Sequence, residues 1–60
     1  MDYVVVYNMD QENKAHFFYY RENALSFIKF MKDMNKTYSL FIYDGEHFKA
    51  VENFTDELDN

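Results

Sequence analysis

The chain has 60 residues, 48% of them hydrophobic, with six tyrosines, seven phenylalanines, no cysteine, no proline and a formal charge of −5. A chain of this length forms one small domain and buries only about 60% of the surface that its unfolded form exposes. Its aromatic content excludes a disordered chain, and the lack of cysteine excludes disulfides and thiolate metal sites. A single glycine excludes the glycine-rich loops that bind nucleotides.

The first predicted elements are two strands. Residues 2–8 are β-branched or aromatic between polar ends, and this stretch is too short for a typical helix. Both of its faces are apolar, which is typical of a strand covered on two sides. Residues 9–13 are mostly polar and predict a loop, after which residues 14–20 resume the aromatic pattern. The sequence therefore predicts a β-hairpin at the amino-terminal end.

A helix follows, because apolar residues now recur at steps of three and four. We expect Asn23 to cap its amino-terminal end and Asn35 to adopt the left-handed conformation at its carboxyl end. The predicted apolar stripe consists of Ala24, Phe27, Ile28, Met31 and Met34.

A second hairpin is predicted over residues 38–43 and 47–51, around the glycine of Asp44-Gly45. A two-residue turn there places Leu40 and Ile42 on the face of His47 and Lys49. A three-residue loop over residues 43–45 places them instead with Phe48 and Ala50. We favour the second register, because it buries a consistent apolar set and leaves Phe41, His47 and Lys49 pointing outward.

These elements predict an α+β domain over residues 1–52, with the order β-β-α-β-β and a mainly antiparallel four-stranded sheet. One helix covers one face of such a sheet. The other face then carries more aromatic surface than a soluble monomer usually exposes, and we expect it to bind protein and to form a homodimer. This face is expected to carry Phe41 and some of Tyr3, Tyr7, Phe17 and Tyr19. The strand residues assigned to protein binding are Tyr3, Tyr7, Phe41 and Tyr43.

Residues 53–60 are predicted to form an acidic tail, because most of the net charge of the chain lies after Val51. Phe54 and Leu58 are four residues apart and share a face if the segment turns helically. With Asp56 and Glu57 they then form an acidic amphipathic hook that binds a partner protein. The alternative is a solvated tail without a binding role.

The helix also carries a basic stripe. Lys29, Lys32 and Lys36 project within about 60° of one another on a helical wheel, and Arg21 extends the stripe if the helix begins early. This pattern supports an alternative function, a nucleic-acid-binding regulator in which lysines neutralise phosphates and strand aromatics stack on bases. A solvated helix face is the simpler interpretation, since nucleic-acid-binding domains tend to be basic and this chain is acidic.

No catalytic, cofactor-binding or metal-binding residues are predicted. Asp44, Glu46 and His47 gather at a turn, but carboxylates beside a surface histidine are usually only solvated. No stretch is long and apolar enough to span a membrane, and we expect a cytoplasmic protein.

In composition the chain resembles the small accessory proteins of phages and mobile elements that bind and inhibit a host protein. The resemblance implies an inhibitor or regulator of another protein. The leading prediction is therefore a cytoplasmic protein-interaction module.

Overall fold

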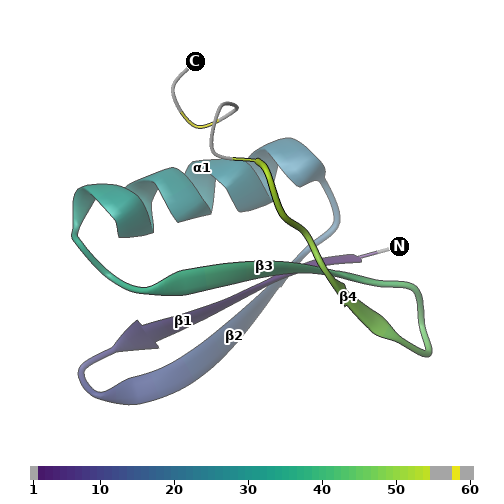
Figure 1. The fold of residues 1–60 in the computed structure, drawn as a ribbon, viewed down its shortest axis with the longest axis horizontal. Helices are drawn as coiled ribbons and strands as arrows, with labels where there is room; N and C mark the ends of the chain where they lie inside the picture. The colour runs from purple at the N-terminus through teal and green to yellow at the C-terminus, as the bar shows by residue number, and fades with distance from the viewer. Residues whose placement is uncertain (1, 55–57, 59–60) are drawn as a thin grey trace.

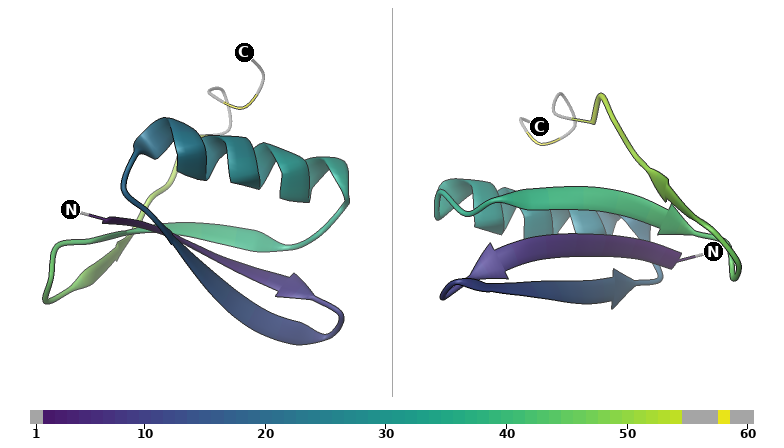
Figure 2. Two further views of the ribbon diagram at one scale, coloured as in Figure 1. Left: turned by 180° about the vertical axis from the view of Figure 1, so that it is seen from behind. Right: turned by 60° about the horizontal axis from the view of Figure 1, so that its bottom comes forward.

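The computed structural model describes residues 2–54 and Leu58. Four strands form one sheet in the order β2-β1-β3-β4, and every neighbouring pair is antiparallel (Figure 1). In chain order the elements are β1 (Asp2–Met9), β2 (Glu12–Phe18), α1 (Arg21–Asp33), β3 (Tyr38–Tyr43) and β4 (Phe48–Ala50). Helix α1 lies across one face of the sheet (Figures 1 and 2). The predicted α+β class, with an antiparallel four-stranded sheet and a helix on one face, is confirmed.

The first hairpin is tighter than predicted. Its connection is the two-residue turn Asp10-Gln11, in which φ is 55° and 68°. Positive φ at both central positions is typical of a type I′ turn, which matches the twist of the flanking strands. The prediction of a five-residue loop is wrong, because the sequence lacks the glycine that usually marks this turn. As a result β1 extends to Met9, and β2 begins at Glu12.

Helix α1 begins at Arg21, three residues earlier than the predicted Asn23 cap implies. Tyr20 occupies the N-cap position without a side-chain hydrogen bond, and the Ala24 N–H donates to its carbonyl oxygen over 3.3 Å. The predicted Asn23 cap is therefore wrong. The first turn of the helix is held by this backbone hydrogen bond to Tyr20, two residues after the end of β2.

The carboxyl end of α1 is as predicted. Asn35 has φ of 58°, and its N–H donates to Lys32 while the N–H of Lys36 donates to Met31, over 3.0 and 2.9 Å. These two bonds form a Schellman motif, which satisfies carbonyl groups that the helix leaves unpaired. The motif turns the chain back toward the sheet.

The second hairpin has a longer loop than either register considered from the sequence. Residues 44–47 connect β3 to β4, and Asp44 Oδ1 accepts the N–H groups of both Glu46 and His47 over 2.8 Å. Gly45 has the expected positive φ, 103°. Phe48 lies opposite Tyr43, and Lys49 opposite Ile42. The favoured register is therefore wrong, because the Asp44 carboxylate stabilises a loop of different length. Leu40 and Ile42 share their face with Lys49, as the alternative register predicted, although the loop is longer than its two-residue turn.

The hydrophobic core lies between α1 and the sheet. Ala24, Ile28 and Met31 are buried on α1, as the helical period predicts, but Met34 follows the end of the helix and is 43% exposed. The buried core cluster consists of Val5, Ala24, Ile28, Leu40 and Leu58.

The carboxyl-terminal segment contributes directly to this core. After β4 the chain passes to the same side of the sheet as α1 (Figure 1). Leu58 is only 3% exposed there, and Phe54 packs against the same cluster. These two side chains, which we expected on a binding hook, instead help to close the domain. Asp56 and Glu57 lie outside the described residues.

Candidate interaction surface

The two faces of the sheet differ in what covers them. The helix side includes Tyr3, Val5, Tyr7, Leu40 and Ile42, which pair along β1 and β3. The opposite face, which we call the open face, has no other described element lying over it (Figure 2). Its side chains alternate with those of the helix side. The apolar and aromatic ones are Val4, Val6, Ala15, Phe17, Phe41, Tyr43, Phe48 and Ala50, and the polar ones are Asp2, Asn8, Asn13 and Ser39.

The open face contains an apolar hollow of about 370 Å³. All four strands contribute to it. The residues that line it are Val4, Val6, Ala15, Phe17, Phe41 and Phe48. Its volume is at the lower end of the range typical of ligand pockets, about 300–1,000 Å³.

Aromatic rings surround this hollow and remain accessible. Phe17 is 52% and Phe48 57% exposed. Tyr43 stacks on Phe48 with ring centroids 4.4 Å apart, and it meets Phe17 edge-on at 6.4 Å. Val4, directly opposite Phe17 on one side and Phe41 on the other, is only 2% exposed. The hollow thus has an aliphatic floor, in which Val4 is buried, Val6 half-buried and Ala15 exposed, and its aromatic sides are at least partly exposed.

The four strand residues that the sequence analysis assigned to an interface lie on two different faces of the sheet. Phe41 lies on the open face, as expected, and so does Tyr43, which the favoured register had placed in the loop. Tyr3 and Tyr7 lie on the helix side, where both pack against the core and Tyr7 meets the ring of Phe27 at 5.0 Å. The expected place of Tyr3 and Tyr7 on the uncovered face is therefore wrong. Since both faces of β1 are apolar, the sequence did not distinguish them.

Several residues of the hollow were not predicted as site residues. Phe48 was assigned to the core through the wrong register, and the aliphatic floor formed by Val4, Val6 and Ala15 was not recognised. The usable signal was strand alternation, which places Val4 and Val6 with Phe17 once Val5 is assigned to the core.

The basic stripe is only partly formed. Helix α1 includes Arg21, Lys29 and Lys32, but it ends at Asp33. Lys36 follows the left-handed residue Asn35, so the helical wheel does not apply to it. Helix α1, which contains these basic residues, lies over one face of the sheet (Figure 2), whereas the strand pairing places the aromatic rings of the open face on the other. A nucleic-acid strand lying on the helix therefore does not reach the open-face rings as stacking platforms.

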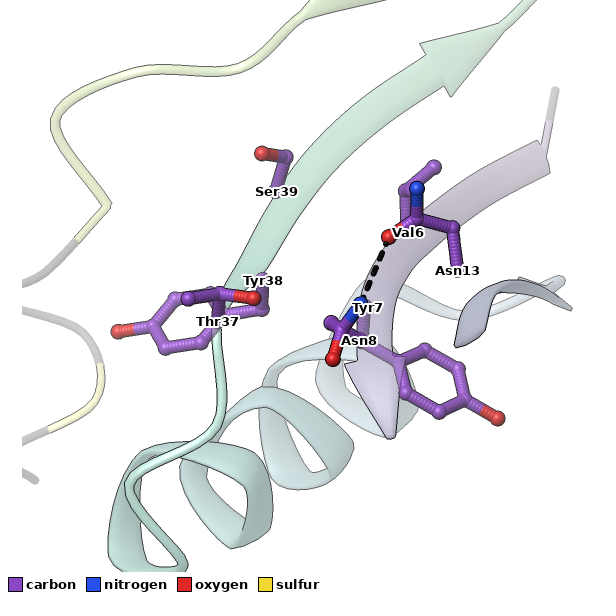
Figure 3. A pocket seen from close by; sticks show the side chains of 7 residues that line it. All are labelled: Val6, Tyr7, Asn8, Asn13, Thr37, Tyr38 and Ser39. Atoms are coloured by element: carbon purple, nitrogen blue, oxygen red, sulfur yellow. Dashed lines mark hydrogen bonds between the residues drawn. The ribbon is translucent and has the colours of Figure 1, made fainter. Parts of the chain in front are cut away.

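A second hollow, of about 150 Å³ and partly lined by polar side chains, lies between the carboxyl end of β1, the start of β2 and the start of β3 (Figure 3). The side-chain amide of Asn8 donates to Asn13 Oδ1 over 3.1 Å, and the Asn8 N–H donates to the Thr37 carbonyl oxygen over 3.2 Å. Tyr7, Tyr38, Ser39 and Val6 complete its lining. It contains no carboxylate or imidazole, so it lacks a general base that works near neutral pH.

The turn with Asp44, Glu46 and His47 has a structural role. The N–H groups of His47 and Glu46, both donating to Asp44, lower the pKa of its carboxyl group. Within residues 2–54 and at Leu58, no group of three histidine or acidic side chains is placed to hold a metal ion. His16 lies elsewhere, stacked on Phe18 with centroids 4.4 Å apart.

Comparison with known proteins found no family model, no curated protein and no solved structure that matches this chain. In the part of the chain that the structure describes, no helix has the length and apolar character needed to cross a membrane.

Proposed function

We propose that this chain is a small protein-interaction module that binds a partner protein through the open face of its sheet. The observation that carries this proposal is the apolar hollow, with Phe17 and Phe48 more than half exposed at its sides. Exposed aromatic side chains around a well-packed apolar site are typical of the residues that contribute most to protein binding. Four hydrogen-bonded strands hold these residues, so binding requires little ordering of the backbone.

The proposed role is binding without catalysis, in which the module inhibits or regulates its partner. We also propose a cytoplasmic location, supported by the lack of cysteine, since small secreted domains usually depend on disulfides. The partner is either a second copy of this chain or a different protein. Composition favours self-association, whereas the charges around the open face favour a different protein, as argued in the next subsection.

The experiment compares substitutions on the two sides of the molecule. The Phe17→Ala/Phe48→Ala variant removes two exposed rings from the open face, and Phe30→Ala is the matched control because Phe30 on α1 is 54% exposed. Each variant is tagged and used for quantitative affinity capture from cells that naturally make this chain. Its solution mass is measured by sedimentation over a range of concentrations.

We expect the double variant to lose captured protein or self-association, while Phe30→Ala retains both. Far-UV circular dichroism checks that each variant is folded. Equal capture and equal mass for the unsubstituted chain and the double variant would rule out the open face as the binding surface.

The alternative function, nucleic-acid binding, would use Arg21, Lys29, Lys32 and Lys36. Its support is the group of basic residues in α1 and just beyond its end. Binding of DNA or RNA at low salt that weakens steeply with added salt would favour it over protein binding. Lys29→Gln/Lys32→Gln should then reduce that binding, and Phe17→Ala should leave it unchanged.

A further inference from the structure

The charges of this molecule are separated between its two sides. Lys14 lies opposite Tyr7, and Lys49 lies opposite Ile42, so both strand lysines are on the helix side of the sheet. The remaining basic residues are in α1 or, for Lys36, directly after it. The open face therefore carries no lysine or arginine among the described residues, which include every basic residue of the chain.

Acidic residues border the aromatic end of the open face. Asp2 occupies the same face of β1 as Val4, and it lies opposite Tyr43. Asp44 and Glu46 are exposed in the loop that leads to Phe48. Because Tyr43 also lies opposite Phe48, all three carboxylates are at the same end of the sheet. The apolar hollow thus opens beside negative charge with no positive charge on its face.

We infer that the occupant of the hollow is a segment of a different protein with a large apolar side chain flanked by lysine or arginine. This inference rests on the proposed function and names the chemistry of the partner. The apolar side chain fills the hollow, and the basic flanks approach Asp2, Asp44 and Glu46. Charged residues at the rim of an interface contribute mainly to specificity and to the rate of association.

A second copy of the chain fits this surface less well. In a two-fold dimer through this face the second copy presents the same face, so it supplies carboxylates and no lysine or arginine to its twin. The area is also small: six paired residues of β1 and β3 span about 20 Å, and four strands about 19 Å, which gives roughly 400 Å² of flat surface. Each partner in a standard stable interface buries about 800 Å². The open face therefore suits a single inserted side chain better than sheet-on-sheet dimerisation.

The test begins with selection of displayed random-sequence peptides on the full chain. Peptides that also bind the Phe17→Ala/Phe48→Ala variant are discarded. We expect the remaining peptides to share an aromatic or large aliphatic residue with an excess of lysine and arginine around it.

A selected peptide then serves as the probe in titrations. Asp2→Asn/Glu46→Gln should weaken its binding about fivefold, as expected for the loss of two exposed charge pairs. The control, Glu12→Gln/Glu22→Gln, removes two acidic residues from the helix side of β2 and from α1, and it should leave binding unchanged. Asp44 is left intact because it stabilises its own loop.

The possible failures separate this inference from the proposed function. Peptides that need Phe17 and Phe48 but show no excess of basic residues would overturn the inference and leave the open face as a binding surface. A dimer that disappears in the Phe17→Ala/Phe48→Ala variant would identify a second copy as the occupant and also overturn it. Selection of no peptide that depends on the two rings, together with a monomeric chain, would overturn both proposals.

Discussion

The two faces of the sheet bury their central valines by different means. Val5, on the helix side, is 0% exposed because Ala24, Ile28 and Leu58 from other parts of the chain pack over it. Val4, on the open face, is 2% exposed although no described element covers that face. Its directly opposed neighbours are Phe17 and Phe41 of the same sheet. Cross-strand neighbours alone are therefore enough to bury a small side chain. Phe41 remains half-buried and Phe17 52% exposed, and this accessible aromatic surface makes the open face a candidate for binding.

The largest expected effect is on the helix side, at Leu58. Leu58→Ala should lower the free energy of unfolding by about 2–5 kcal/mol, because it leaves a cavity in the core. A domain of this size has a total stability of roughly 3–9 kcal/mol, so this variant should be close to unfolded. Urea denaturation followed by circular dichroism measures the change.

Met34→Ala is the control for Leu58→Ala, because Met34 is an exposed apolar residue just beyond α1. It should cost less than about 1 kcal/mol. Similar losses for the two variants would contradict a core role for Leu58.

The next effect compares the two valines themselves. Val5→Ala should destabilise the protein by about 2–3 kcal/mol, because its cavity is closed by a second layer. Val4→Ala should cost about 1 kcal/mol, because the space it leaves joins the open hollow and admits water. Chemical denaturation of both variants gives the difference. A larger loss for Val4→Ala would mean that the open face is better packed than the rings of Phe17 and Phe48 suggest.

A smaller change in stability is expected from the turn of the first hairpin, which joins β1 to β2. Gln11 has φ of 68°, which is unfavourable for a residue with a side chain. Gln11→Gly should stabilise the protein by about 1 kcal/mol, since glycine adopts this conformation without strain. Glu12→Gly, in the adjacent strand, should destabilise it. Thermal unfolding of the pair decides whether this turn has the left-handed geometry.

The smallest effect is the pH dependence of the loop beside Phe48. The pKa of Asp44 is lower in the folded protein than in the unfolded chain, so its stabilisation is present above the ordinary aspartate pKa. It is lost as pH falls through the lower, folded value. The amide resonances of Glu46 and His47 should shift together in that acidic range. Asp44→Asn should abolish this titration, and an unchanged titration would assign it to another carboxyl group.

Sequence reasoning worked where the signal is local. The buried stripe of α1, including Ala24, Ile28 and Met31, follows from helical periodicity. The left-handed Asn35 follows from the tolerance of asparagine for positive φ. It failed at the turn formed by Asp10 and Gln11, where no glycine marks the conformation, and at the start of α1, where the backbone needed no polar cap.

The candidate site was only partly predictable. Phe41 was assigned to the exposed face correctly, but the favoured register placed Tyr43 in the loop and Phe48 in the core. A change in loop length that alters the register by one residue moves every side chain of a strand to the other face. Here the hydrogen bonds to the Asp44 carboxylate stabilise a four-residue loop. The pattern of residue types in the sequence does not predict these bonds.

The sequence by itself determined the types of element, their order and the apolar stripe of the helix, because these depend on residues close together in the chain. Only the tertiary structure decided which face of β1 is covered, since valine and tyrosine make both faces apolar. It also decided that Leu58 belongs to the core. Both outcomes depend on contacts between segments far apart in sequence, where the packing of α1 and Leu58 against Val5 selects one face and leaves the other open.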